Sequence, residues 1–334
     1  MNSEQAAIME IRNLRKWFPV KRGIFGRNRG FVKAIDDINL TIRRGDTLGL
    51  VGESGCGKST LARVILRLID PTDGQLIFKG KDITTIPQSG LLNFRRYMQI
   101  IFQDPYASLN PRMRVRDILA EPFVIHNLHE KGDYTRKVEE LLDMVSLNRD
   151  SLGKFPHEFS GGQRQRLCIA RALAVEPELL VCDECVSALD VSVQAQIINL
   201  LMRLQRQLNL TLVFISHDLR VVRHISSHVA VLYLGKIVEY ASQKELFNNP
   251  EHPYSKALLS AVPLADPDVE RRRIGLCGEI PSPINLPDGC SFHTRCPIMR
   301  EDCKKSAPAL FEVRPGHLCR CPYHEQIGGY CDKT

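Results

Sequence analysis

The segment with the most specific chemistry is a glycine-rich stretch, GESGCGKS, at residues 52–59. Its spacing fits the pattern GxxxxGK[ST], in which glycines let successive backbone N–H groups curl around a phosphate. A buried apolar run, residues 48–51, precedes it, and a helical pattern over residues 59–69 follows it. The loop therefore opens a helix, whose N-terminal dipole favours anions. The motif predicts a triphosphate site with contacts from Gly52, Ser54, Gly55, Cys56, Gly57, Lys58, Ser59 and Thr60.

Two side chains of this loop have distinct roles in the prediction. Lys58 places a point charge on the β- and γ-phosphates of ATP, and the Ser59 hydroxyl ligates Mg²⁺. Cys56 stands near the helix N-terminus, where the pKa of a thiol tends to fall. We interpret Cys56 as a small residue that fits the loop, with a regulatory thiol as the alternative.

Polar side chains end several other buried runs. Asp183 and Glu184 follow the run at residues 179–182, His217 follows that at 212–215, and Gln103 follows that at 99–102. Buried strands that alternate with helical patterns (residues 136–145, 163–174 and 193–207) indicate an α/β fold with crossovers. Alternation around Ile8 indicates a half-buried edge strand, and residues 32–42 alternate in the same way. Residues 89–175 form a mostly helical insert.

A second candidate anion site is the sequence SGGQ at residues 160–163. A hydroxyl, free backbone N–H groups and a following helix N-terminus together make an anion cradle. One chain binds one ATP and so has one γ-phosphate, but it has two anion cradles. Both cradles would be filled if two chains formed a dimer with ATP held between them.

In this order after a phosphate loop, these motifs resemble the ATP-binding-cassette (ABC) ATPases over residues 8–260. The resemblance implies that Phe18 stacks on adenine, with Trp17 as the competitor. It also implies that Asp183 holds Mg²⁺ through water and that Glu184 is the general base. The remaining implied contacts are Gln103 to Mg²⁺ and the membrane partner, His217 to the γ-phosphate, Ser160, Gly162 and Gln163 to the ATP of the opposite subunit, and Asp190 between the two sites. Cys185 stands where the family usually has proline, so this turn is less restricted.

Cysteine is concentrated near the C-terminus, with seven of the 11 cysteines between residues 277 and 331. No stretch of 18 apolar residues and no secretory signal is present, so we expect a cytosolic chain with reduced thiols. Clustered cysteines there indicate a metal more than disulfides. Four thiolates suit zinc or an iron–sulfur cluster, and the absence of close CxxC pairs in this region favours a four-iron four-sulfur (4Fe-4S) cluster, with zinc and free thiols as alternatives. The candidate ligands are Cys290, Cys296, Cys303 and Cys321, with Cys319 as a substitute for the last.

The sequence around these cysteines, GCSFHTRCPIMREDC and GHLCRC, resembles the C-terminal extension of the ATPase subunits of oligopeptide and dipeptide importers. FQDPYASLNPRM and HPYSKALLSAVP resemble the same family, closest to its second, F-type ATPase, and the resemblance covers nearly the whole chain. It favours Cys321 over Cys319. It implies ATP-driven import of short peptides, with nickel complexes or oligosaccharides as alternative cargo.

The resulting prediction is a P-loop ABC ATPase domain over residues 1–263, with a helical subdomain at 89–175, followed by a small cysteine-rich, loop-dominated domain over 264–334. The implied partners are a second ATPase subunit (a paralogue or another copy), two membrane permease subunits, and indirectly an extracytoplasmic peptide-binding protein. The chain would lie at the cytoplasmic face of the membrane, with residues 103–121 and the helical insert receiving the permease. The net charge of +7 is not concentrated in a long basic block, so we expect no nucleic-acid partner. The runner-up is a soluble ABC ATPase of DNA repair or translation, against which stands the absence of a long coiled-coil insertion.

Overall fold

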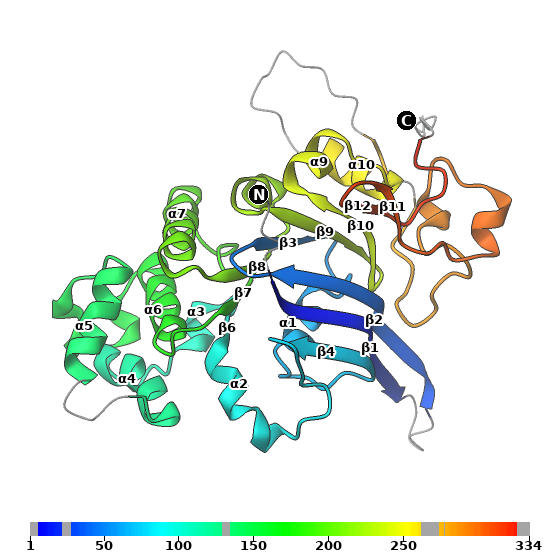
Figure 1. Cartoon of the computed structure of the whole chain (residues 1–334). Helices are drawn as coiled ribbons and strands as arrows, with labels where there is room; N and C mark the ends of the chain where they lie inside the picture. Colours follow the sequence, from blue (N-terminus) through cyan, green and yellow to red (C-terminus); the bar gives the residue numbers. More distant parts are fainter. Residues whose placement is uncertain (1–5, 22–27, 129–133, 262–273, 277, 326–334) are drawn as a thin grey trace, which may run out of the picture. The chain divides into compact units, whose positions relative to one another are not determined.

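The computed structural model describes residues 6–21, 28–128, 134–261, 274–276 and 278–325 (Figure 1). The chain divides into two compact units, one of Met1–Met9, Thr41–Thr47 and Ile77–Ser216, the other of Glu10–Leu40, Leu48–Leu76 and His217–Thr334. The predicted domain boundary at residue 263, Cys277 and Cys331 lie outside the described residues. The division into domains at that residue therefore stays a prediction.

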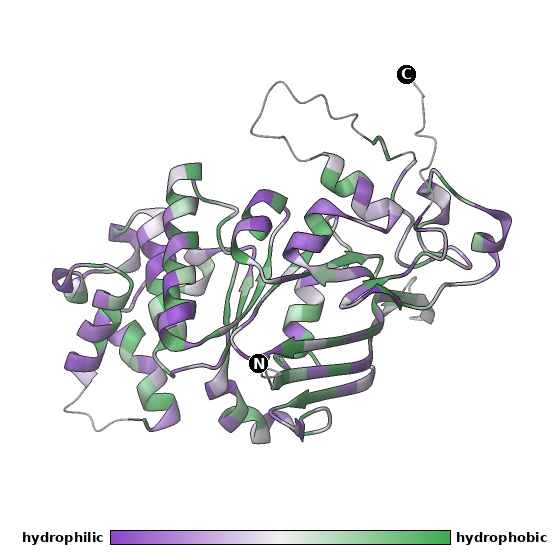
Figure 2. Cartoon of the chain, turned by 45° about the horizontal axis from the view of Figure 1, so that its top comes forward, coloured by the Kyte–Doolittle hydropathy of each residue, from purple (hydrophilic) through white to green (hydrophobic). Residues whose placement is uncertain are grey.

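The first unit contains three parallel strands, β6 (Met98–Ile101), β7 (Leu179–Asp183) and β8 (Thr211–Ile215), in the order β6-β7-β8. Every residue of β7 and β8 is buried. Parallel strands covered on both faces need continuous apolar sequence, which explains why these runs were recognisable from the sequence. All three predicted strands are confirmed to within one residue at each end, and Figure 2 shows the corresponding apolar colouring of the strands.

Helices make up most of the remainder of this unit. The segment 89–175, predicted as a helical insert, contains mostly helices, with β6 among them. Helix α6 contacts α3, α4, α5 and α7 as well as β6, so it connects the helical part to the strands. The helices are η1 (Gln88–Leu91), α2 (Leu92–Tyr97), α3 (Pro105–Ser108), α4 (Val115–His126), α5 (Tyr134–Met144), η3 (Arg149–Gly153), η4 (Pro156–Glu158), α6 (Gly161–Leu173) and α7 (Val191–Leu208).

The second unit contains strands in the order β3-β9-β10-β12-β11, with β3 and β9 parallel and the other pairs antiparallel. The strands are β3 (Thr47–Val51), β9 (His228–Tyr233), β10 (Lys236–Ser242), β11 (Phe311–Arg314) and β12 (His317–Cys319). In the β10–β12 pair, Glu239 lies opposite Cys319. The cysteine-rich region thus adds two strands to a sheet, which the sequence interpretation missed because its short strands lack a clear alternation.

A separate sheet has the order β2-β1-β4-β5, formed by β1 (Ala7–Lys21), β2 (Asn28–Arg43), β4 (Asp73–Phe78) and β5 (Lys81–Asp82). The prediction of an edge strand around Ile8 is wrong, because β1 lies between β2 and β4. Alternation reports that one face of a strand is buried and carries no information about the neighbours on either side. The other helices are α1 (Lys58–Ile65), α8 (Leu219–Ile225), α9 (Gln243–Asn248), α10 (Pro253–Ser260), η5 (His293–Arg295) and η6 (Glu301–Lys304). Among the described residues, no helix has the length and apolar character needed to cross a membrane.

Candidate nucleotide-binding site

The glycine-rich loop lies between β3 and α1, as its sequence predicts. Gly57 precedes α1 with φ 109°, and a Cβ atom built there would lie 2.2 Å from the Ala34 carbonyl oxygen. Only glycine fits this position, because both the backbone conformation and the space exclude a side chain. Gly55 and Ser54 are exposed, and Ser59 and Thr60 are half-buried in the first turn of α1. The helix therefore begins at the place where a phosphate would meet its N-terminal N–H groups.

Lys58 is held inside the loop. Its Nζ donates hydrogen bonds to the carbonyl oxygens of Gly52 at 2.8 Å and Glu53 at 3.0 Å, and the residue is 5% exposed. The ammonium thus faces the concave side of the loop, where the sequence predicts the phosphates. Cys56 is 4% exposed, and burial raises the pKa of its thiol despite the nearby ammonium of Lys58. A buried, protonated thiol supports the interpretation of Cys56 as a small residue that fits, and the lowered pKa that its helix-terminal position suggested is not found.

Asp183 and Glu184 mark the end of β7 in the first unit. Asp183 is 4% exposed, and Glu184 has φ 49°, in the left-handed region that costs energy for a residue with a side chain. The Glu184 N–H donates to the Ile215 carbonyl at 3.1 Å, and its carboxylate accepts a hydrogen bond from Gln103 Nε2 at 3.1 Å. Gln103 also reaches the Ser187 hydroxyl at 3.5 Å. Residues held in such uncommon conformations are frequent at catalytic sites. The hydrogen bond from Gln103 brings two of the predicted site residues, Gln103 and Glu184, together.

The SGGQ segment forms the start of α6. The Ser160 hydroxyl accepts from the Gln163 N–H at 3.4 Å, and the Gln163 side-chain oxygen accepts from the Ser160 N–H at 3.0 Å. This reciprocal arrangement is a capping box, so the N–H of Gln163 is not free as the sequence interpretation assumed. Asp190 stands one residue before α7 and is exposed.

The remaining predicted ATP contacts lie in the second unit. His217 is exposed just before α8. Phe18 and Trp17 each have a lysine over the ring, Lys16 at 5.0 Å and Lys33 at 4.9 Å, so the choice of adenine platform stays open. Sequence reasoning missed Tyr254 and Arg295, which reach Glu53 from 201 and 242 positions further along the chain. No local signal marks such partners.

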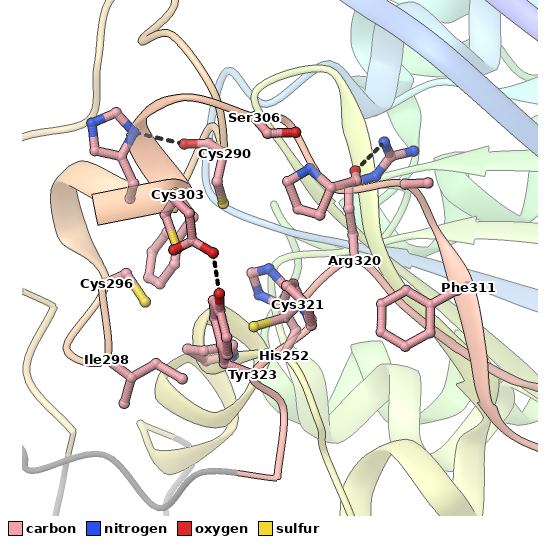
Figure 3. A pocket seen from close by; sticks show the side chains of 17 residues that line it. His252, Cys290, Cys296, Ile298, Cys303, Ser306, Phe311, Arg320, Cys321 and Tyr323 are labelled. Atoms are coloured by element: carbon pink, nitrogen blue, oxygen red, sulfur yellow. Dashed lines mark hydrogen bonds between the residues drawn. The ribbon is translucent and has the colours of Figure 1, made fainter. Parts of the chain in front are cut away.

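The four candidate cysteine ligands line one cavity of about 300 Å³, together with His252, Phe292 and Tyr323. Figure 3 shows the side chains of Cys290, Cys296, Cys303 and Cys321 around the same opening. Burial raises the pKa of the Cys296 thiol to about 12 and that of Cys321 to about 11. Cys319 is fully buried on β12 and is not part of the cavity lining. Within the described residues, no group of three or more His, Cys, Asp or Glu side chains is close enough to hold a metal ion, and the cysteines there are all free.

Two parts of this chain match known protein families. Residues 35–187 match the family described as ABC transporter, and residues 238–303 match that described as oligopeptide/dipeptide transporter, C-terminal region. The chain is 52% identical to the oligopeptide transport ATP-binding protein AppF of Bacillus subtilis, over 96% of this chain and 98% of that protein. It is 50% identical to the putative oligopeptide transport ATP-binding protein YkfD of the same organism, over 94% of each chain.

Solved structures show the same fold. The dimeric ATP-binding cassette MJ0796 in a post-hydrolysis state, bound to ADP and phosphate, is 26% identical with a TM-score of 0.62, covering 70% of this chain and 98% of that one. The protein cbiO1 of Clostridium perfringens, part of the ABC transporter complex cbiONQ, is 27% identical with a TM-score of 0.62, covering 73% of this chain and 91% of that one.

An α/β core in which a phosphate-binding loop opens a helix and a buried strand ends in Asp183 and Glu184 defines an ATPase of the ATP-binding-cassette class. Such ATPases bind ATP together with Mg²⁺. The identity across 96% of the chain then fixes the family: this chain belongs to the oligopeptide transport ATP-binding proteins of ABC transporters.

Proposed function

We propose that this ATPase powers import of dipeptides and oligopeptides through a membrane permease. The observation that carries the proposal is the similarity to AppF, which extends from the ATPase core through the cysteine-rich region. The working complex would contain a second ATPase subunit, two permease subunits at whose cytoplasmic side this chain binds, and indirectly an extracytoplasmic peptide-binding protein. Identifying the ATPase subunit that co-purifies with this chain and the permease would show whether it is a paralogue or another copy.

Within the ATPase, Glu184 is the proposed general base. Its carboxylate would accept the proton of the attacking water, and the hydrogen bond from Gln103 would fix its orientation. Lys58 would neutralise charge on the β- and γ-phosphates, and His217 would contact the γ-phosphate. Mg²⁺, held by Ser59, Gln103 and Asp183 (the last through water), would neutralise phosphate charge during hydrolysis.

The SGGQ segment would act on ATP bound to the partner subunit. Support comes from the position of Ser160, Gly162 and Gln163 at the N-terminus of α6, a helix of 13 residues. ATP would then join two subunits and hydrolysis would separate them, because the γ-phosphate that links the two cradles is lost when ATP becomes ADP. Asp190, at the start of α7, would link the two nucleotide sites.

Transport by the purified complex tests the cargo. The chain with its co-purifying permease and peptide-binding protein, reconstituted in vesicles, should accumulate a labelled short peptide only when ATP is supplied. Lys58→Ala in the same complex is the control and should abolish uptake. Uptake of a nickel complex or an oligosaccharide in place of peptide would overturn the peptide assignment and leave the ATPase assignment intact.

For the cysteine-rich region we propose a 4Fe-4S cluster held by Cys290, Cys296, Cys303 and Cys321. A zinc ion bound tetrahedrally at about 2.3 Å would need its sulfurs about 3.8 Å apart, converging on one point. The four thiols instead share the lining of a cavity of about 300 Å³ with other side chains, and this space suits a group of several atoms better than a single ion. The region has little apolar sequence of its own, and such small units often depend on a metal for folding.

Metal analysis tests this proposal. Protein purified without oxygen should be brown and contain about four iron and four sulfide per chain. Cys321→Ser should lose the colour, whereas Cys319→Ser, a change to a buried cysteine outside the cavity, should keep it. Stoichiometric zinc without iron or sulfide would reject the cluster, and a bleached Cys319→Ser with a brown Cys321→Ser would reject this ligand set.

A further inference from the structure

The phosphate-binding loop contains an acidic residue, Glu53, directly after its first glycine. A carboxylate at this position opposes the triphosphate that the loop must hold, because like charges repel strongly where water is partly excluded. The loop can bind ATP well only if this charge is neutralised and turned away from the phosphates. Two residues from much later in the chain, Tyr254 and Arg295, contact Glu53.

Arg295 donates two hydrogen bonds to the Glu53 carboxylate. Its Nη1 donates to Glu53 Oε2 at 2.7 Å and its Nη2 donates to Oε1 at 3.0 Å. The Arg295 side chain is 5% exposed and that of Glu53 is 23% exposed, so the pair is largely shielded from solvent. A bidentate arginine–carboxylate pair restricts the orientation of the carboxylate as well as neutralising its charge. The Glu53 side chain is therefore held at one orientation.

Tyr254 fixes the backbone of the same residue. Its hydroxyl accepts a hydrogen bond from the Glu53 N–H at 2.9 Å. Tyr254 is itself fully buried at the start of α10, where its N–H donates to Nδ1 of His252 at 3.1 Å. Burial lowers the pKa of His252 to about 4, so the imidazole is neutral and can accept this bond.

An aromatic cluster joins the two contacts. The ring of Tyr233 lies 4.7 Å from that of Tyr254 and 5.3 Å from that of Phe292, and the Arg295 guanidinium lies 5.9 Å from the Tyr233 ring. Phe292 is 1% exposed and precedes Arg295 by three residues. Packing of these rings positions the arginine, because aromatic contacts at such distances restrict side-chain motion.

We propose that Arg295 and Tyr254 are positioning residues for the nucleotide site, which neutralise and orient Glu53 so that the loop accepts the triphosphate. The cysteine-rich region then contributes directly to ATP affinity through Arg295. The proposal depends neither on the cargo nor on whether the cysteines bind a cluster or zinc.

A pair of charge-neutralising substitutions tests it on the full-length chain, with equilibrium binding of ATP and Mg²⁺ as the readout. Arg295→Gln should weaken ATP binding about tenfold, equivalent to about 1.4 kcal/mol, because the carboxylate loses its counter-charge. Adding Glu53→Gln to this variant should recover most of the loss, since the repulsive charge is gone. Arg300→Gln, a loss of one exposed arginine in the same region, is the matched control and should leave affinity within about twofold.

The kinetic pattern separates positioning from general stability. In the assembled transporter, Arg295→Gln should raise KM for ATP about tenfold while kcat at saturating ATP changes less than about threefold. Unchanged affinity in Arg295→Gln would overturn the proposal, as would a loss that Glu53→Gln does not reduce. If Arg295→Gln does not fold, Tyr254→Phe decides: it keeps the ring, removes the acceptor for the Glu53 N–H, and should raise KM about threefold, whereas wild-type KM would refute the positioning role.

Discussion

Replacing Gly162 with alanine tests the contact between the start of α6 and helix α7. A Cβ atom built on Gly162 would lie 2.4 Å from Cγ1 of Val193, more than 1 Å closer than the normal carbon–carbon separation of about 3.5 Å. Valine in a helix has one strongly preferred side-chain rotamer, so Val193 cannot easily turn away. The two helices must therefore separate or the SGGQ segment must shift.

The expected cost of Gly162→Ala is about 1–3 kcal/mol, the usual range for overpacking. For a chain of this size that lowers Tm by about 2 °C per kcal/mol. Val193→Ala removes the clashing methyl group and, because the side chain is half-buried, should itself cost about 1 kcal/mol or less. The double variant should therefore melt above Gly162→Ala alone.

Thermal unfolding of the four proteins, followed by circular dichroism, measures this cycle. A Gly162→Ala protein that melts within about 1 °C of the wild type would refute the reasoning. A double variant no more stable than Gly162→Ala would show that the cost has another origin. ATPase rates on the same samples would show whether restored packing also restores the predicted action of Gly162 on the partner's ATP.

Three further predictions address the nucleotide site. Glu184→Gln should keep ATP affinity, lose turnover and form an ATP-bound dimer that gel filtration detects. Turnover near the wild-type rate would show that Glu184 is not the general base. Ser160→Arg should abolish hydrolysis but leave ATP binding to the monomer unchanged, and a tenfold weaker monomer, about 1.4 kcal/mol, would mean that SGGQ acts within its own chain. Gly57→Ala should prevent ATP binding, because its Cβ would overlap the Ala34 carbonyl oxygen, and normal binding would contradict that geometry.

Much of the fold was predictable where one local rule dominates. The strands β6, β7 and β8 are continuous apolar runs because both of their faces are covered, so composition alone marks them. The short strands β11 and β12 have no such signature, since their residues are mostly polar or exposed and their pairing with β10 comes from packing. For the same reason alternation around Ile8 identified a strand but misplaced it at an edge.

The sequence by itself determined the chemistry of contiguous motifs. Lys58 and Gly57 lie within one loop and Asp183 and Glu184 at one strand end, so a few adjacent residues specify the backbone and the groups that it presents. Only the tertiary structure decided that Cys321 lines the cavity while Cys319 does not, because a difference of two residues depends on how β12 pairs. The contact between Arg295 and Glu53, which lie 242 positions apart in the sequence, was likewise visible only in the tertiary structure. The position of Arg295 depends on the packing of the aromatic rings beside it, which no local pattern encodes.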